Sequence, residues 1–566
     1  MLKKIRVLLA TLCFVAITLL FLDFSGTLHH WLGWLAKIQF LPAVLALNVV
    51  VIVALLLLTV LFGRVYCSVI CPLGVFQDGV AHLSRKGKKR KYSYSKEVKW
   101  LRYGVWVLFV VALVAGVNAF VALLAPYSAW GRIVQNLLAP VWQWGNNLLA
   151  LIAERRGSYA FATKEVWMKG LPTFIVAVVT LVAVVILAWK NGRTYCNTVC
   201  PVGTTLSFFS RFAMFRPVID ASKCKSCHLC EKRCKAACID IDGGKKIDYS
   251  RCVDCFNCLD NCKFGALKYR FAWHSTAGQP SGSGENSVFT DSSTPLHPQG
   301  GIEGRSPQTP PVATLRDKAP AASGTSTSED HIAINQGRRA FLAGSAVALG
   351  AAAGIPALAQ TEEGEVLEKE NEGGFADIIP KKAPKRTTPI TPFGSESVKK
   401  FYQHCTACQL CVSVCPNNVL RPSGKLEHLM QPEMSFERGY CRPECVKCSE
   451  VCPAGAILKI TPEEKTQWKV GTAHITPWLC LVDNGTVEEC GNCARHCPVG
   501  AIQMVRKEGT DPADPANLTE ADRHATRVPV VNEEKCIGCG ACENLCPSRP
   551  ISAITVDGYQ VHHIQR

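Results

Sequence analysis

Long apolar stretches with few charged residues dominate the first part of the chain. Each is close to the roughly 20 residues that an α-helix needs to cross the hydrocarbon core of a bilayer. They cover residues 6–22, 41–62, 101–125 and 171–189. The pattern predicts an α-helical membrane domain with four transmembrane helices over residues 1–203. No small-residue cleavage site follows Leu22, so we expect the first stretch to be retained rather than removed as a signal peptide.

Basic residues mark one side of these stretches. The densest basic run, residues 85–91, lies between the second and third stretches, and Lys190 and Arg193 follow the fourth. Because lysine and arginine are enriched in cytoplasmic loops, both ends of this domain are expected on the cytoplasmic side of a bacterial inner membrane. The same placement explains the formal net charge of +17 without nucleic acid, for which no aromatic stacking motif is present. We therefore expect membrane lipid, and no nucleic acid, among the partners.

The composition changes after the first cysteine-rich region. Residues 274–336 are rich in Gly, Ser, Pro and Thr, which predicts a disordered linker. Residues 337–360 form a weaker fifth apolar segment introduced by Arg338 and Arg339, and this segment resembles a twin-arginine export signal or anchor. The alternative is an ordinary transmembrane helix with flanking arginines. A second linker, residues 361–398, precedes the C-terminal domain.

Most of the 30 cysteines recur in compact groups of four. The spacing Cys-x2-Cys-x2-Cys-x3-Cys is typical of [4Fe–4S] ferredoxins, in which three cysteines bind one cluster and the fourth binds its neighbour. Two such groups lie in residues 204–273, and four related groups lie in residues 399–566. Disulfide frameworks suit small secreted domains, and structural zinc usually takes two separated Cys-x-x-Cys knuckles. We therefore predict two α+β ferredoxin-like domains that hold six [4Fe–4S] clusters.

The crossed rule assigns the ligands of the first, two-cluster domain. One cluster takes Cys224, Cys227, Cys230 and Cys262, and the other takes Cys252, Cys255, Cys258 and Cys234. Cys238 is left over and is expected to be a buried thiol rather than a ligand.

The C-terminal domain contains the other four groups, and the inner two carry extra residues between their cysteines. These insertions favour a nested arrangement, in which the inner groups pair inside a ferredoxin unit made by the outer groups. The predicted ligand sets are Cys405, Cys408, Cys411 and Cys546; Cys536, Cys539, Cys542 and Cys415; Cys441, Cys445, Cys448 and Cys497; and Cys480, Cys490, Cys493 and Cys452.

A repeat of seven positions follows two of the apolar stretches. Gly63, Arg64, Tyr66, Cys67, Cys71, Pro72 and Gly74 recur as Gly192, Arg193, Tyr195, Cys196, Cys200, Pro201 and Gly203. The i, i+4 spacing predicts that both thiols of a pair lie on one helical face at the cytoplasmic edge. The four cysteines are candidates for a cofactor-binding site, either as a metal or cluster site or as redox-active thiols. The alternative is packing cysteines beside helix-terminating Pro and Gly.

With these motifs, residues 1–273 resemble the NapH type of membrane ferredoxin, the membrane component of a quinol dehydrogenase. Residues 337–566 resemble the NapG type of periplasmic four-cluster ferredoxin, so the chain looks like a fusion of the two. The resemblance implies electron transfer from the quinol pool to a periplasmic reductase or cytochrome, typically for nitrate. Because twin-arginine export carries folded proteins, the four-cluster domain is expected in the periplasm and the two-cluster domain in the cytoplasm.

No acid–base pair, nucleophile triad or dinucleotide-binding motif stands out beside the cysteines. We therefore expect no catalytic residues, and an electron-transfer subunit rather than a stand-alone enzyme. A second hypothesis is an assembly or regulatory factor for a respiratory metalloenzyme, because similar membrane ferredoxins serve in such systems.

Overall fold

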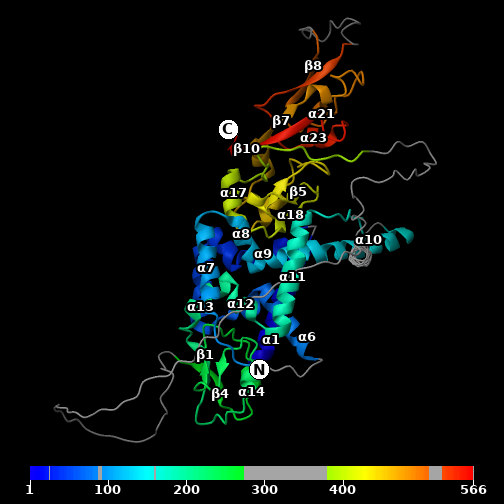
Figure 1. Cartoon of the computed structure of the whole chain (residues 1–566). Coiled ribbons are helices and arrows are strands. Elements are labelled where there is room, and N and C mark those ends of the chain that lie inside the picture. The colour runs from blue at the N-terminus through cyan, green and yellow to red at the C-terminus, as the bar shows by residue number, and fades with distance from the viewer. Residues whose placement is uncertain (24–25, 87–91, 159–160, 273–378, 509–524, 565–566) are drawn as a thin grey trace, which may run out of the picture. The chain divides into compact units, whose positions relative to one another are not determined.

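The computed structural model describes residues 1–23, 26–86, 92–158, 161–272, 379–508 and 525–564 (Figure 1). The expected linker at 274–336, the twin-arginine-type segment at 337–360 and residues 361–378 of the second linker lie outside the described residues. The described residues before position 273 are mainly helical, whereas those after position 378 form short helices and two-stranded sheets.

Two helices among the described residues are long and apolar enough to cross a membrane. They are α1 (Leu2–Leu22) and α11 (Leu171–Asn191), each of 21 residues. Both match stretches expected from the hydropathy pattern. Their exposed side chains include large apolar residues, such as Leu8 and Leu12 in α1 and Val179 in α11. Such a surface suits contact with lipid.

The expected span at 41–62 is not one helix. It divides into α4 (Phe40–Leu45) and the apolar helix α5 (Val49–Phe62). Asn48 causes the break, because its side chain caps α5 by accepting a hydrogen bond from the N–H of Val51 (3.2 Å).

The expected span at 101–125 is also divided. It forms α7 (Lys99–Val114) and α8 (Asn118–Leu124). Gly116, with φ of 76°, lies in the turn that follows α7 and reverses the local backbone. Among the described residues the expected four transmembrane helices are therefore not confirmed, because Asn48 and Gly116 interrupt two of the apolar stretches.

Shorter helices complete this part of the chain. They are α2 (Thr27–Leu32), α3 (Trp34–Lys37), a π-helical turn at Tyr66–Ile70, α6 (Pro72–Lys86), α9 (Pro126–Ile133), a π-helical turn at Val134–Leu138, α10 (Ala139–Arg155), α12 (Thr194–Thr198) and α13 (Pro201–Ser210). The helix α6, which follows the first copy of the seven-position repeat, packs against α11, which precedes the second copy. Reciprocally, α13 follows the second copy and packs against α5, which precedes the first. This exchange brings the two copies together.

The next region has the two small antiparallel sheets and two short helices of a ferredoxin-like fold. Strand β1 (Phe215–Ile219) pairs with β4 (Leu267–Phe271), and β2 (Ile239–Asp240) pairs with β3 (Lys246–Ile247). The helices are α14 (Leu229–Lys232) and α15 (Asn257–Asn261). Their core contains several of the cysteines together with apolar residues such as Ile239, Val253 and Leu267.

Among its described residues, the C-terminal region combines six short helices with three antiparallel strand pairs. The pairs are β5 (Leu420–Pro422) with β6 (Pro432–Met434), β7 (Trp468–Ile475) with β10 (Ile554–Ile564), and β8 (Ile502–Arg506) with β9 (Arg527–Val531). The helices are α17 (Val398–His404), α18 (Leu410–Val414), α19 (Lys447–Val451), α20 (Pro462–Gln467), α21 (Asn492–Arg495) and α23 (Ala541–Leu545), with 3-10 turns at Leu426–His428 and Pro477–Leu479. Each of α18, α19, α21 and α23 contains the third cysteine of a group.

Candidate iron–sulfur sites and a buried four-cysteine centre

In four of the cysteine groups the backbone turns in the same way. The second and fourth residues after the first cysteine have positive φ angles between 46° and 78°. These residues are Ser226, His228, Asp254, Phe256, Ala407, Gln409, Gly538 and Gly540. Most are not glycine, so they hold a conformation that other residues rarely adopt. Such turns direct successive N–H groups into one concavity, an arrangement found around iron–sulfur clusters. For example, the backbone N–H of Ala407 donates a hydrogen bond to Sγ of Cys405 (3.4 Å).

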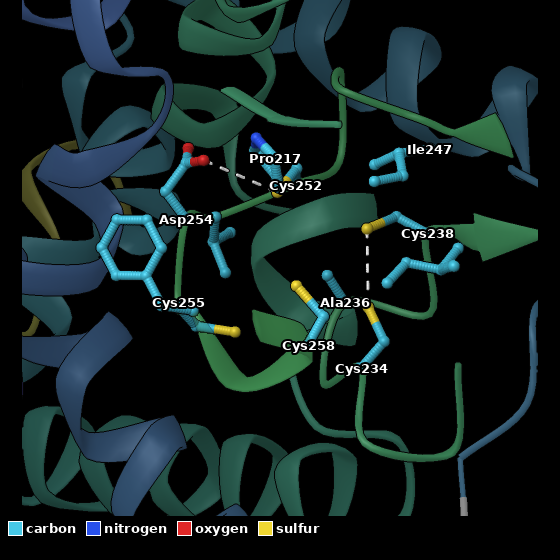
Figure 2. Close-up of a pocket in the computed structure, with 12 residues that line it drawn as sticks. Pro217, Cys234, Ala236, Cys238, Ile247, Cys252, Asp254, Cys255 and Cys258 are labelled. Carbon is cyan, nitrogen blue, oxygen red and sulfur yellow. Dashed lines mark hydrogen bonds between the residues drawn. The ribbon is translucent and has the colours of Figure 1, made fainter. Parts of the chain in front are cut away.

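The thiols of the two-cluster domain surround two cavities. Cys224, Cys227, Cys230 and Cys262 line one of them. Cys234, Cys252, Cys255 and Cys258 line the other, together with Cys238 (Figure 2). Among the described residues, no three ligand-type side chains converge closely enough to hold a single metal ion. Thiols distributed around a space fit a four-iron cube, which takes one thiolate at each iron.

Cys238 contacts a ligand thiol. It is 2% exposed, and its sulfur lies 3.5 Å from that of Cys234. A dashed line marks this contact in Figure 2. The hydrogen bond from Cys238 lowers the pKa of the Cys234 thiol to about 7, and the same contact raises the pKa of Cys238 well above its ordinary value. As a proposed cluster ligand Cys234 would be a thiolate, to which the thiol of Cys238 can donate. Cysteine spacing alone did not indicate this contact.

In the C-terminal domain, consecutive cysteine groups pair with each other, so the predicted nested arrangement was wrong. In each site, the first three cysteines of one group are joined by a fourth cysteine that differs from the predicted one. The sets brought together are Cys405, Cys408, Cys411 and Cys452; Cys441, Cys445, Cys448 and Cys415; Cys480, Cys490, Cys493 and Cys546; and Cys536, Cys539, Cys542 and Cys497.

Helix packing explains this pairing. The helix α18 packs against α19, and α21 packs against α23, so the first group faces the second and the third faces the fourth. The insertions in the inner groups only lengthen the loops between cysteines of one group. Loop length therefore carried no information about which groups face each other.

A buried lysine adjoins one of these cysteine sets. The ammonium of Lys465 donates to Sγ of Cys441 (3.2 Å) and to the carbonyl oxygens of Arg442 and Cys445, and the side chain is 1% exposed. Burial raises the pKa of the Cys441 thiol to about 11, although the charge of Lys465 opposes that rise. Lys465 follows the Thr461–Glu464 capping box that begins α20. The capping-box pattern is visible in the sequence, but the contact with Cys441 is not.

The two copies of the seven-position repeat meet in one buried site, here called the four-cysteine centre. It consists of Cys67, Cys71, Cys196 and Cys200, which are 4–5% exposed and lie within electrostatic range of one another. The amide of Gln77 donates to Sγ of Cys196 (3.3 Å). The structure therefore brings together all four candidate residues of this site.

The two thiols of each pair do not share a helical face, which corrects the expectation from their spacing. The N–H of Cys71 bonds to the carbonyl of Tyr66 (2.9 Å), and the N–H of Cys200 bonds to the carbonyl of Tyr195 (3.0 Å). These contacts span five residues instead of four and end the helical segment. The following proline begins the next helix in each copy, α6 or α13.

Each copy of the repeat has an arginine that hydrogen-bonds to the other copy. Arg64 Nη2 donates to the carbonyl of Cys196 (3.1 Å), and Arg193 Nη1 donates to the carbonyl of Cys67 (2.7 Å). Each guanidinium also lies near the first cysteine sulfur of its own copy, at 3.9 Å for Arg64 and 3.8 Å for Arg193. Two buried positive charges therefore flank the four thiols, where they would partly balance an anionic group bound between them.

The last glycine of each copy makes room for these guanidinium groups. A Cβ at Gly74 would lie 2.7 Å from Nη1 of Arg193, and a Cβ at Gly203 would lie 2.6 Å from Nη2 of Arg64. Both positions thus require the absence of a side chain, which accounts for the repeated glycine.

The four-cysteine centre contacts the two-cluster domain through ion pairs. Asp78 of α6 accepts a hydrogen bond from Arg193 Nε (2.7 Å) and pairs with Lys235 (3.0 Å). Both Asp78 and Lys235 lie within electrostatic range of Cys255. In addition, Asp254 accepts a hydrogen bond from the N–H of Arg64 (3.0 Å), and burial raises the pKa of this carboxyl to about 7.

The centre also connects to the four-cluster domain through two buried tyrosines. Tyr66 lies within electrostatic range of Cys71, and Tyr127 lies within range of both Tyr66 and Cys408. Nearby, the side-chain amide of Asn136 donates to Oε1 of Gln409 (3.2 Å), the residue after Cys408. Tyr66, Tyr127 and Cys408 also belong to one buried cluster of side chains.

Two family models match the chain. A 4Fe-4S binding domain matches residues 44–91 and 173–218, which contain the four-cysteine centre, and a 4Fe-4S dicluster domain matches residues 404–483 and 487–549. The expectation of 4Fe–4S ferredoxin domains is therefore confirmed, and the chain is an iron–sulfur protein of the electron-transferring ferredoxin type.

Several of the relatives it matches are named as Nap ferredoxin-type proteins. The chain is 26% identical to ferredoxin-type protein NapG of Haemophilus influenzae over 38% of this chain and 69% of NapG. It is 28% identical to ferredoxin-type protein NapF of Escherichia coli over 31% of this chain and 90% of NapF. Ferredoxin-type protein NapH of H. influenzae is 27% identical over 33% of this chain, which spans about half (52%) of NapH.

Proposed function

We propose that the chain is a membrane-bound electron relay that takes electrons from the quinol pool and passes them to a periplasmic reductase or another redox partner. In this proposal NapH-like and NapG-like parts are fused in one polypeptide. The observation that carries it is the position of the four-cysteine centre. The backbone N–H of Arg64 donates to Asp254 of the two-cluster domain (3.0 Å), and Cys67 and Cys196 belong to the same buried cluster of side chains as Cys405 and Cys408. A protein whose regions acted independently would not need this buried connection.

In this proposal α1 and α11 span the membrane, and the pairs α4–α5 and α7–α8 cross it as broken helices. Support comes from the contacts of α1 at its two ends. Lys3 pairs with Asp260 of the two-cluster domain (3.0 Å), whereas the ring of Phe21 packs on that of Tyr127 (5.3 Å between centroids). A helix of 21 residues is about 30 Å long, close to the thickness of the hydrocarbon core. The two ferredoxin regions are thus proposed to face opposite sides of the membrane.

The six cysteine sets in the ferredoxin domains are the proposed ligands of six [4Fe–4S] clusters, so anaerobic protein should contain about 24 iron atoms per chain. When bound, such clusters accept and release single electrons. The chain's own residues bury the clusters, donate N–H groups to the thiolates and place Lys465 beside Cys441. The four-cysteine centre is proposed as an additional site between the two regions, either for a cluster or as redox-active thiols.

The proposal is tested by adding a reduced short-chain quinol analogue to anaerobic membranes that contain the full chain. We expect bleaching of the visible cluster absorbance. Cys224→Ala, which removes a proposed cluster ligand in the two-cluster domain, should reduce the amplitude. If full iron content is present and no bleaching occurs, the relay proposal fails, and an assembly or regulatory role becomes the better explanation.

A further inference from the structure

A large cavity lies where the apolar helix α1 meets the two-cluster domain. Its volume is about 870 Å³, within the range of small-molecule binding sites. The lining comes from α1, from α6 and from residues of the two-cluster domain that adjoin ligand cysteines. Among the latter are Lys235, which follows Cys234, and Asn257, which precedes Cys258.

The cavity has an apolar wall and a polar end. Ala10 and Phe14 of α1, together with Phe76 of α6, form the apolar wall. The polar end contains Asp78, the imidazole of His82 and the Asn257 side chain. A ligand that fits both parts has a ring with hydrogen-bonding groups and an apolar extension.

The charges on the lining favour a neutral ligand. Lys3 pairs with Asp260 (3.0 Å), while Arg6 and Lys235 both pair with Asp78 (2.7 and 3.0 Å). These cations already have carboxylate partners, so they do not require the phosphate of an anionic lipid. Arg233, at the exposed rim, is outside this set of pairs.

The cavity also adjoins a proposed redox site. Asp78 and Lys235 lie within electrostatic range of Cys255, a member of the cysteine set in Figure 2. A molecule in the cavity would therefore lie beside that set, with the ion pairs of Asp78 between them.

We propose that this cavity binds the ring of a quinol, with its isoprenoid tail along the apolar face of α1. The ring hydroxyls would hydrogen-bond to polar groups such as His82 and Asn257. This inference rests on the proposed function and assigns the quinol to a particular site. It concerns binding alone and holds whether or not the clusters are loaded.

Gly79 of α6 offers a precise way to fill the cavity. It lines the cavity, and a Cβ at this position would have no neighbour within 4 Å, so Gly79→Leu places a side chain in open space. Gly104 of α7 is a matched control, because it is also helical and a Cβ there also has no neighbour within 4 Å. It is absent from the cavity lining. Ala10→Trp is a second cavity-filling variant.

The test uses the purified full chain in detergent and a photoreactive azidoquinone with a short isoprenoid tail. We expect labelled peptides from α1 or α6, displaced by an unlabelled quinol analogue but not by excess anionic phospholipid. Gly79→Leu and Ala10→Trp should weaken quinone binding at least tenfold, whereas Gly104→Leu should leave it unchanged. Labelling elsewhere, displacement by phospholipid alone, or normal binding by a folded Gly79→Leu protein would overturn the site assignment.

These outcomes separate the site from the proposed function. If quinol bleaches the clusters in membranes but the label maps elsewhere, the relay proposal stands and the cavity assignment fails. If the quinone neither binds nor reduces the clusters, both fail.

Discussion

Arg193 Nη1 lies 2.7 Å from the carbonyl oxygen of Cys67, although 126 residues separate them along the chain. Arg64 makes the reciprocal contact with the carbonyl of Cys196 at 3.1 Å. Each arginine therefore supports the cysteine pair of the other repeat, and neither copy of the four-cysteine centre is complete alone. This reciprocity explains why Gly, Arg, Tyr, Cys and Pro recur together rather than the cysteines alone.

Arg193→Lys should damage this centre. The guanidinium donates at once to Cys67 and to Asp78, whereas a lysine ammonium lacks the planar fork needed for both contacts. Loss of one hydrogen bond to a charged group costs about 2 kcal/mol, so we expect a lower thermal unfolding midpoint in detergent. Arg211→Lys, at an exposed arginine, is the control and should unfold like the wild type. Equal midpoints for all three proteins would contradict the structural role of Arg193.

Iron analysis of a variant in which Cys67 and Cys196 are replaced by serine tests whether the four-cysteine centre holds a cluster. If the centre holds a four-iron cluster, the wild type should contain about 28 iron atoms and the double variant about 24. If it works as redox-active thiols, both proteins should contain about 24, and only the wild type should show the additional thiols after reduction and alkylation.

The sequence predicted the cysteine groups and the two longest apolar helices, because both are recorded as local patterns. It did not predict the breaks at Asn48, which caps the start of α5, and at Gly116, in the turn after α7, both inside apolar segments. The sequence also did not predict which C-terminal cysteine groups pair with each other. Which group faces which depends on packing between α18 and α19 and between α21 and α23, and spacing within one group does not encode that packing.

The corrected pairing predicts which cysteine substitutions are redundant. Cys405 and Cys452 belong to one set in the structure, so the double variant Cys405→Ser/Cys452→Ser should lose about four iron atoms, like either single variant. Cys452→Ser/Cys480→Ser removes ligands from two sets and should lose about eight. Iron analysis of anaerobic protein measures both. The nested arrangement requires the opposite result, with the larger loss in the first pair.

Cys238 should tune a cluster without binding it. Its thiol donates to Cys234 across 3.5 Å, and a donor to a ligand sulfur stabilises the more negatively charged, reduced cluster. Cys238→Ala should therefore retain full iron content but lower the midpoint potential of one cluster in an EPR-monitored titration. Cys238→Ser keeps a donor and should restore much of the potential. Loss of about four iron atoms in the alanine variant would instead make Cys238 a ligand.

The two ferredoxin regions should lie on opposite sides of the membrane. Lys3, at the start of α1, pairs with Asp260 in the two-cluster domain, and Phe21, near its end, packs on Tyr127, which is within electrostatic range of Cys408. From the positive-inside pattern we expect the first of these ends in the cytoplasm, and the proposed twin-arginine segment around Arg338 and Arg339 would supply the additional crossing.

Replacing Arg338 and Arg339 by lysine tests this topology, because lysine keeps the charge but disrupts a twin-arginine signal. In the wild type, protease added to spheroplasts should digest residues 360–566 and spare the two-cluster domain. In the variant, residues 360–566 should be protected while the first helices remain inserted. Lys381→Arg and Lys382→Arg, which change a basic pair beyond the signal, should behave like the wild type. Equal protection of residues 360–566 in wild type and twin-lysine variant would exclude the two-sided arrangement, because export of that domain would then not depend on the arginine pair.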